Sequence, residues 1–193
     1  MKLLEDRILK DGRCLGKDIL KVDSFLNHQI DVALVDAMGQ EFARLFEGLG
    51  VNKILTIETS GIPIAYAAAR AMGDLPLVFA KKTTPSTMVD GMYSAPVKSF
   101  TKGTVSNVIV STRYLGPDDV VLLIDDFLAH GEAASGLAEI CRQAGAKCVG
   151  LGAVIEKKYQ GGAEKLRKLG LRVESLAVIA SLEDGKIEFD KTL

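Results

Sequence analysis

The sequence predicts an α/β fold in which helices cover both faces of a mainly parallel sheet. Short apolar, β-branched runs alternate with segments whose apolar residues recur every three or four positions, and a glycine follows most of these helical segments. The chain has 193 residues, of which 48% are hydrophobic and 25% are charged, as in an average globular domain. We therefore expect a single domain over residues 1–193 that binds ligands at the carboxyl ends of its strands.

Charge and composition exclude several classes of protein. The 24 basic and 25 acidic residues give a net charge of -1, which argues against binding to nucleic acid through its phosphates. There is no apolar run of about 18 residues, and charges interrupt the apolar residues of the amino-terminal segment, so we expect a cytoplasmic protein without a membrane span. Three cysteines without C-x-x-C spacing and only two histidines predict neither a disulfide framework nor a metal centre built from protein ligands.

The first half of the chain alternates helical and strand patterns. Asp31 is a plausible N-cap, because apolar residues at helical spacing follow it. Pro63 suits the first turn of a later helix. The predicted order is a helix at 1–10, an extended or irregular segment at 13–27, a helix after Asp31, a strand at 53–57, a helix from about 63 to 72 and a strand at 77–80.

The amino-acid composition changes at the start of the second half. Residues 81–103 are rich in Thr, Ser, Pro and Gly without a sustained apolar period, and a long irregular stretch of this kind in a compact domain is usually functional or mobile. The predicted order then continues with a β-rich hairpin arm at 104–115, a strand at 120–124, a helix at about 133–144, a strand at 148–155, a helix near 163–169 and a strand at 172–180.

Paired carboxylates follow the most apolar strand of the chain. Asp125 and Asp126 come directly after residues 120–124, and repulsion and burial disfavour the charged form of such a pair unless it has a partner. Residues 129–133 then offer small side chains and successive backbone amides at a helix start, which is an anion site. Acids for sugar hydroxyls beside amides for a phosphate suggest a ribose phosphate, although acidic residues after strands also occur as simple helix caps.

This strand, acidic pair and small-residue loop resemble the phosphoribosyl pyrophosphate signature of the type I phosphoribosyltransferases. Many members carry Thr-Gly-x-Thr in the loop, whereas this chain reads Ala129, His130, Gly131, Glu132 and Ala133. The loop is more similar to the Ala-Asn-Gly-x-Ala of bacterial xanthine phosphoribosyltransferases, with His130 at the position of the usual Asn. Similarity also runs through the amino-terminal helix and residues 27–31, 58–63 and 156–157, so it covers essentially the whole chain.

The resemblance implies a pyrophosphate site made by two further segments. Thr59, Ser60 and Gly61 match the loop that lies against the pyrophosphate of the donor, although residues 58–63 also suit an ordinary strand-to-helix turn. Lys81 is the expected basic contact, while a pair of solvated lysines remains the alternative for Lys81 and Lys82. A hood formed by residues 1–30 and the carboxyl-terminal part, and a flexible lid at about 81–115, belong to the same expectation.

The resemblance also implies a purine site. Leu20, Asn27 and Lys157 match the xanthine-binding positions of the family, and Tyr159 is expected to stack on the ring, with packing as its alternative role. The amide of Asn27 and the ammonium of Lys157 can donate to the exocyclic oxygens of xanthine. The amino group of adenine would leave these donors unpaired, which costs binding free energy.

The implied reaction is the transfer of a phosphoribosyl group from phosphoribosyl pyrophosphate to xanthine, with Asp125 and Asp126 at the ribose hydroxyls. A magnesium ion carried mainly by the donor and a homodimer are further implications, with no metal ligand assigned to the protein. A purine-responsive regulator that binds the donor without turnover is the alternative, although its relatives add a DNA-binding region and a more basic surface. A transferase that prefers guanine, hypoxanthine or adenine is a third interpretation.

Overall fold

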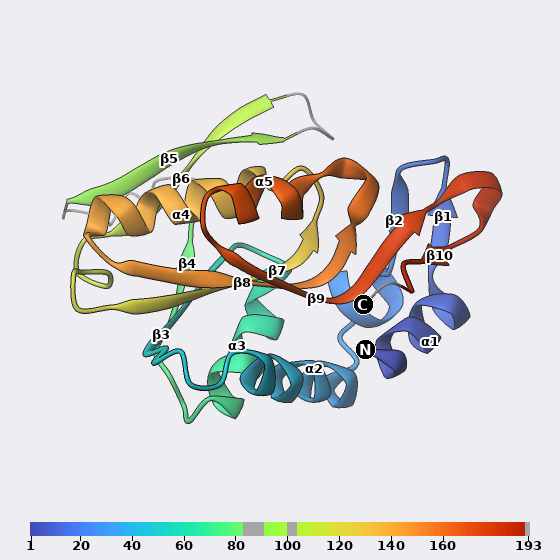
Figure 1. Cartoon of the computed structure of the whole chain (residues 1–193), viewed down its shortest axis with the longest axis horizontal. Helices are drawn as coiled ribbons and strands as arrows, with labels where there is room; N and C mark the ends of the chain where they lie inside the picture. The colour runs from blue at the N-terminus through green and yellow to red at the C-terminus, as the bar shows by residue number, and fades with distance from the viewer. Residues whose placement is uncertain (83–90, 100–103, 192–193) are drawn as a thin grey trace.

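The protein is built on a six-stranded sheet, seen across the middle of Figure 1. The computed structural model describes residues 1–82, 91–99 and 104–191. All neighbouring strands are parallel except the last pair, in which β10 is antiparallel to β9, so the predicted fold class is confirmed. The order across the sheet is β10 (Glu188–Phe189), β9 (Arg172–Ser181), β8 (Lys147–Lys157), β7 (Val120–Leu128), β3 (Lys53–Ile57) and β4 (Leu77–Ala80).

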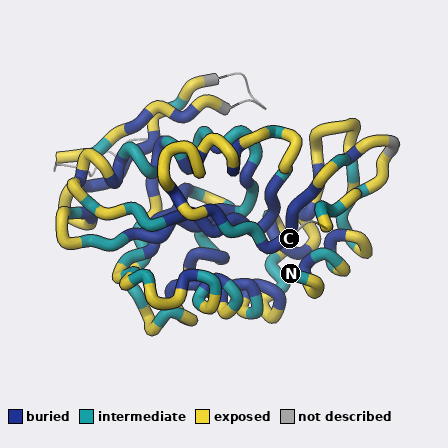
Figure 2. The backbone as a smooth tube through the Cα atoms, in the orientation of Figure 1, coloured by how far each residue is buried: buried dark blue, intermediate teal, exposed yellow. Residues whose placement is uncertain are grey.

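Helices pack on both faces of this sheet (Figure 1). α2 (Val32–Leu45) and α3 (Gly61–Ala71) lie on one face, and α4 (Glu132–Ala144) and α5 (Gly162–Lys168) lie on the other. The backbone is most continuously buried along the central strands and on the sides of the helices that face them (Figure 2). Each face of the sheet therefore has its own apolar core, and the sheet lies between the two cores.

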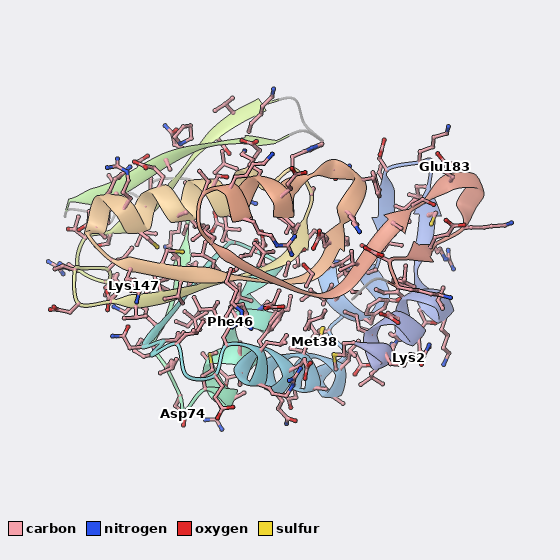
Figure 3. The ribbon with its side chains drawn as sticks, viewed as in Figure 1. Lys2, Met38, Phe46, Asp74, Lys147 and Glu183 are labelled. Atoms are coloured by element: carbon pink, nitrogen blue, oxygen red, sulfur yellow. The ribbon has the colours of Figure 1, made fainter. Side chains whose placement is uncertain are left out.

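The predicted cap of α2 is confirmed. The Asp31 carboxylate accepts a hydrogen bond of 3.1 Å from the backbone N–H of Leu34, which satisfies an amide that has no partner within the helix. From this start the apolar period carries Met38 and Phe46 to the side of α2 that faces the sheet (Figure 3).

α2 and the sheet approach one another closely at Gly152 of β8. A Cβ atom at this position would lie 2.7 Å from Cε1 of Phe42 and 2.8 Å from Cδ1 of Ile124. Only a residue without a side chain leaves room for the Phe42 ring at this point, so the glycine sets the distance between the two layers.

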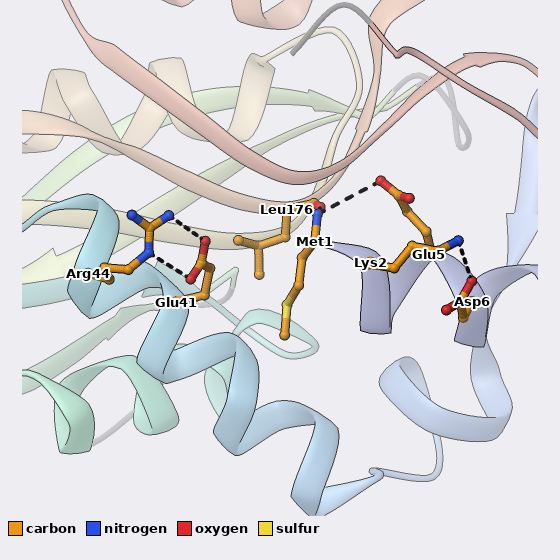
Figure 4. Close-up of polar contacts among 7 residues, drawn as sticks. All are labelled: Met1, Lys2, Glu5, Asp6, Glu41, Arg44 and Leu176. Carbon is orange, nitrogen blue, oxygen red and sulfur yellow. Dashed lines mark hydrogen bonds and ion pairs between the residues drawn. The ribbon is translucent and has the colours of Figure 1, made fainter.

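The amino-terminal segment packs at the β9 end of the sheet. The Met1 ammonium donates to the carbonyl oxygen of Leu176 in β9 and pairs with Glu5, as Figure 4 shows together with the Lys2–Asp6 pair of α1 and the Glu41–Arg44 pair of α2. The segment predicted as extended or irregular is more regular than expected. It contains an antiparallel β1–β2 hairpin and a π-helical turn. The elements are α1 (Lys2–Asp11), β1 (Arg13–Leu15), β2 (Ile19–Lys21) and the turn Asp23–Asn27.

The prediction of irregular structure throughout residues 81–103 was wrong. β5 (Met92–Ser99) pairs in antiparallel register with β6 (Thr104–Ser111), and this ribbon lies over α4 in Figure 1. Alternate residues of the ribbon, Ala95, Val97, Val108 and Val110, are buried in the core on the α4 side of the sheet. Parts of the predicted lid at 81–115, namely residues 83–90 and 100–103, lie outside the described residues.

No helix in the described part of the chain is long and apolar enough to cross a membrane.

Replacement of Gly152 by alanine tests the spacing between α2 and the sheet. We expect G152A to lower the free energy of unfolding by about 1–3 kcal/mol, because the new methyl group overpacks a closed core. Urea denaturation followed by circular dichroism measures the change. Gly116→Ala is the matched control, since a Cβ at Gly116 meets nothing within 4 Å. Equal stability of G152A and the unmodified protein would contradict the proposed role of the glycine.

Candidate functional site

The carboxyl ends of β3, β7 and β8 open into a cleft of about 630 Å³. Since β7 lies between the other two strands, the loops that follow all three strands meet around its end. The cleft is lined by Asp18, Ile19, Leu20, Ile57, Glu58, Thr59, Ser60, Gly61, Lys82, Val97, Lys98, Ser106, Asp125, Asp126, Phe127, Leu128, Ala129, His130, Gly131, Glu132, Ala133, Ala134, Lys157 and Gln160.

Asp125 and Asp126 lie at the floor of this cleft. They were predicted to follow a strand that ends at residue 124, but β7 continues to Leu128, because β8 pairs with it as far as Glu156. Asp125 is buried and its Oδ1 atom accepts a hydrogen bond of 3.0 Å from the backbone N–H of Asp126. Burial first, and then the neighbouring Asp126 carboxylate, raise the pKa of Asp125 well above its usual value, whereas Lys82 opposes this shift.

The first residue of α3 packs directly against this floor. A Cβ atom at Gly61 would lie 2.3 Å from Oγ1 of Thr56 and 3.5 Å from Oδ1 of Asp125. Thr56 is fully buried, and its hydroxyl oxygen has no hydrogen-bond partner among the described residues. Gly61 therefore lets the amino-terminal end of α3 approach the acidic strand end more closely than any other residue would.

All five residues of the predicted phosphate loop, 129–133, line the cleft. Gly131 has a φ of 75°, in the left-handed region that favours glycine, and α4 starts directly after it at Glu132. The first amides of α4 have no acceptor within the helix, and the helix dipole favours negative charge at this end. The loop and the start of α4 together can hold an anion such as a phosphate group.

The loop between β3 and α3 forms the other wall of the cleft. Thr59, Ser60 and Gly61 all line it, and the peptide bond between Glu58 and Thr59 is cis. Their contact with a pyrophosphate group stays a prediction. The Glu58 carboxylate accepts a hydrogen bond of 2.6 Å from the backbone N–H of Lys82, which ties this loop to the end of β4.

Of the two lysines after β4, Lys82 lines the cleft and the predicted basic contact Lys81 is not among the lining residues. Side chains alternate along an extended chain, so Lys81 lies on the same side as Phe79, and its ammonium is 5.9 Å from the centre of that ring. The backbone of Lys81 pairs with Ile109 in β6. Lys82 faces the opposite way and lines the cleft.

Lys157 stands at the opposite end of the cleft, where β8 ends. Its ammonium donates a hydrogen bond to the carbonyl oxygen of Asp18 in the β1–β2 turn and lies 5.5 Å from the centre of the Phe127 ring. Burial lowers the pKa of Lys157, while Asp18 acts in the opposite direction. Leu20, at the end of the same hairpin, also lines the cleft, so two of the four predicted base-site residues lie together here.

Asn27 and Tyr159 are not among the cleft-lining residues. Asn27 ends the π-helical turn, and its Oδ1 atom is buried without a hydrogen-bond partner among the described residues. Tyr159 follows Lys157 in a short 3₁₀ turn and is 42% exposed. Their roles in base binding remain predictions.

Sequence reasoning missed several residues of the cleft. Phe127 is a partly exposed aromatic residue beside the acidic pair, and its position directly after Asp126 was the available signal. Lys98 and Ser106 come from the β5–β6 ribbon, where no strand was predicted on the β5 side. Asp18 and Gln160 are brought in by a hairpin turn and by the segment after β8, and neither stands in a recognisable motif.

The described residues contain no group of three or more His, Cys, Asp and Glu side chains that could hold a metal ion. The cleft nevertheless offers the carboxylates of Glu58, Asp125 and Asp126, and oxygen atoms of this kind are the ligands that Mg²⁺ prefers. The donor set therefore fits a magnesium ion that obtains most of its ligands from a bound substrate and from water.

Comparisons with known proteins show the family and the fold of the chain. A family model described as a phosphoribosyl transferase domain matches residues 22–173. Xanthine phosphoribosyltransferases of Moorella thermoacetica and Streptococcus agalactiae are each 53% identical to the chain over 189 residues, covering 98% of it and 96% and 97% of their own lengths. The fold is similar to that of a Giardia lamblia APRTase crystallised with 9-deazaadenine, with a TM-score of 0.76 at 22% identity over 91% of this chain and 96% of that one.

The burial of Asp125 predicts a dependence of stability on pH. A folded-state pKa above the unfolded value contributes stability below the unfolded pKa, and this contribution is lost as the pH rises through the folded value. We expect Asp125→Asn to be more stable than the unmodified protein at pH 7–8, with the difference shrinking toward pH 4. Urea denaturation across this range measures it.

Asp36→Asn, on the exposed side of α2, is the control for the general effect of removing a carboxylate. A stability difference between D125N and the unmodified protein that does not vary with pH would refute the shift.

Proposed function

Because the chain belongs to the phosphoribosyl transferase domain family, we propose that it is a purine salvage enzyme that transfers the 5-phosphoribosyl group from phosphoribosyl pyrophosphate to xanthine. The products are xanthosine 5'-monophosphate and pyrophosphate. The observation that carries the proposal is the 53% identity to xanthine phosphoribosyltransferases over 98% of the chain. The presence of an acidic strand end, an anion loop and a half-buried lysine in one cleft supports it independently.

The donor would lie along the carboxyl ends of the strands. The amides of residues 129–133 bind its 5-phosphate, and the carboxylates of Asp125 and Asp126 accept hydrogen bonds from the ribose hydroxyls. Thr59, Ser60 and Gly61 bind the pyrophosphate, with the ammonium of Lys82 as the nearby cation. Each part of the donor thus meets a group of complementary charge or hydrogen-bonding type.

In the reaction, the bond between the anomeric carbon and a pyrophosphate oxygen breaks, and the leaving group keeps the electron pair. A ring nitrogen of xanthine forms the new bond to the same carbon and loses its proton to water. Positive charge develops on the ribose ring as the old bond breaks, so the carboxylate of Asp126 stabilises it from the floor of the cleft. Lys82 and the amides of the β3–α3 loop stabilise the negative charge on the pyrophosphate.

A magnesium ion would be held by Asp125, Asp126 or Glu58 together with oxygen atoms of the donor, and when bound it supplies positive charge beside the pyrophosphate. The side chains of the protein bind and orient the substrates around it.

The base binds at the Lys157 end of the cleft, and the residues there select it. The ammonium of Lys157 and the amide of Asn27 donate to the exocyclic oxygens of xanthine, and Leu20 contributes apolar contact. Phe127, 5.5 Å from the Lys157 ammonium, is a second aromatic candidate for stacking beside Tyr159. The buried Oδ1 atom of Asn27 has no partner among the described residues; as an acceptor it would pair with a ring N–H of the base, while the Nδ2 group of the same amide donates to an exocyclic oxygen.

Two broader features belong to the same proposal. The enzyme is a cytoplasmic protein, which agrees with its three free cysteines, because disulfides are rare in that compartment. It is also a homodimer, supported by the exposed aromatic residues Tyr66 of α3 and Phe79 of the edge strand β4. Light scattering of the purified protein measures the mass directly.

The first test is the release of pyrophosphate from phosphoribosyl pyrophosphate and magnesium, with xanthine, guanine, hypoxanthine and adenine in separate reactions. We expect xanthine to give the highest kcat/KM, because only its oxygen pattern satisfies both donors. Preference for another purine would retain the reaction and reject the assigned base. Tight binding of the donor without turnover of any base would favour the regulator.

Lys157→Ala sharpens this test. Loss of a charged hydrogen bond should reduce kcat/KM for xanthine about 10- to 100-fold. Lys147→Ala is the matched control, because Lys147 is the exposed first residue of the same strand and does not line the cleft.

The two lysines after β4 provide a second matched pair. We expect Lys82→Ala to raise the KM for phosphoribosyl pyrophosphate about 10-fold or more, because it removes the cation from the pyrophosphate end of the cleft. Lys81→Ala should change this KM less than twofold, since its ammonium lies over Phe79. Steady-state kinetics at saturating xanthine separates the two. A larger effect of the Lys81 variant would reverse the assignment.

A further inference from the structure

The phosphate loop is hydrogen-bonded to the segment at the end of β8, residues 157–162. The backbone N–H of Gly162 donates a hydrogen bond of 3.0 Å to the carbonyl oxygen of Ala129. Nδ1 of His130 lies 3.2 Å from the carbonyl oxygen of Gln160. Two separate hydrogen bonds therefore join residues 129–130 to residues 160–162.

The fit between these two segments leaves no space for a side chain. A Cβ atom at Gly162 would lie 2.3 Å from the carbonyl oxygen of Ala129 and 2.8 Å from the amide nitrogen of Gly131. These atoms belong to the backbone and cannot rotate away. The φ angle of Gly162 is outside the left-handed region, so contact with the loop, and not backbone strain, is the reason that glycine is required here.

An ion pair links the elements that follow the two segments. The Lys165 ammonium of α5 lies 2.6 Å from the Glu132 carboxylate at the first residue of α4. This pair is partly exposed and contributes little stability by itself. It is a third contact between α5 and the start of α4, where the phosphate is expected.

The same short segment begins in the other half of the cleft. Lys157 is its first residue, and only the single 3₁₀ turn Lys158–Gln160 separates it from Gly161 and Gly162. Gln160 itself lines the cleft. A displacement of residues 160–162 is therefore transmitted over a few residues to the ammonium that meets the base.

We propose that residues 157–162 form a bridge that couples the phosphate loop to the base site, with Gly162 as the positioning residue at the phosphate end. An anion on the loop amides fixes residues 129–131. The two hydrogen bonds then hold residues 160–162, so the backbone next to Lys157 is kept in one position before the base arrives. The identity of the ligands rests on the proposed function.

The test measures the dissociation constant of xanthine by calorimetry on the full chain, with and without ribose 5-phosphate as the probe for the phosphate loop. In the unmodified protein we expect ribose 5-phosphate to tighten xanthine binding about 10-fold. In Gly162→Ala the ratio of the two dissociation constants should fall toward one, whatever the change in the affinity for xanthine alone. A purely structural role of Gly162 would weaken both affinities together.

Two further variants distinguish loss of the coupling from a general loss of structure in Gly162→Ala. His130→Ala shortens only a side chain of the phosphate loop and should lower the coupling factor in the same direction. Gly116→Ala is the neutral control.

Hydrogen exchange separates failure of the bridge from failure of the proposed function. Ribose 5-phosphate alone should slow the exchange of the amides of residues 157–162 in the unmodified protein and not in Gly162→Ala. If another purine proves to be the substrate, it replaces xanthine in the calorimetry. A coupling factor of one in the unmodified protein, an unchanged factor in both variants, or exchange unaffected by ribose 5-phosphate would overturn the bridge even where the transferase assay succeeds.

Discussion

The burial of Asp125 beside Asp126, at the end of a central strand, is the constraint on which the rest of the cleft depends. A carboxyl group in this position has a raised pKa because water is excluded and a second acid is adjacent. Some of its neighbours must therefore be small, so that they can pack closely around the carboxyl group. Others must be polar or positively charged, so that they offset the cost of its charged form. Gly61 meets the first requirement by bringing the start of α3 against the acid, and Lys82 meets the second by opposing the shift.

The position of β7 in the sheet brings the surrounding loops next to the acidic pair. β3 and β8 flank the strand, so the loop before α3 and the segment before α5 both end beside the acidic pair. The phosphate loop continues β7 itself. Three segments that are far apart in the sequence are thus placed around one pair of residues by the strand order alone, which is the reason that parallel sheets bind ligands at this edge.

Strands with continuous apolar runs were predictable from the sequence, and strands with mixed composition were not. Residues 53–57 and 77–80 were predicted with the observed bounds, because each is a short, largely apolar run between turn signals. β5 was missed because its regular alternation leaves only Ala95 and Val97 as buried apolar residues, while a proline and a lysine occupy exposed positions between and beside them. The end of β7 was placed too early, because paired acids rarely continue a buried strand, and only its hydrogen bonding to β8 extends it to Leu128.

The candidate site shows the same division between local and long-range information. The loops at 59–61 and 129–133 are contiguous, so a resemblance in the sequence was enough to place them in the cleft. The choice between Lys81 and Lys82 depended on which side of an extended chain each faces after β4, and pairing with β6 sets that orientation. Phe127 was beside a recognised motif, but its contact with Lys157 joins two strands and is visible only in the fold.

The exchange of the usual Asn for His130 in the phosphate loop also has a physical explanation. Nδ1 of His130 lies 3.2 Å from the carbonyl oxygen of Gln160, and a carbonyl oxygen can only accept, so this nitrogen carries the proton. An Asn side chain has a donor, Nδ2, at the corresponding δ position. Both residues can therefore make the same bond to the segment below the loop. The side chain at this position then supports the loop, and the backbone amides remain available for the phosphate, as expected of a site built on a helix start.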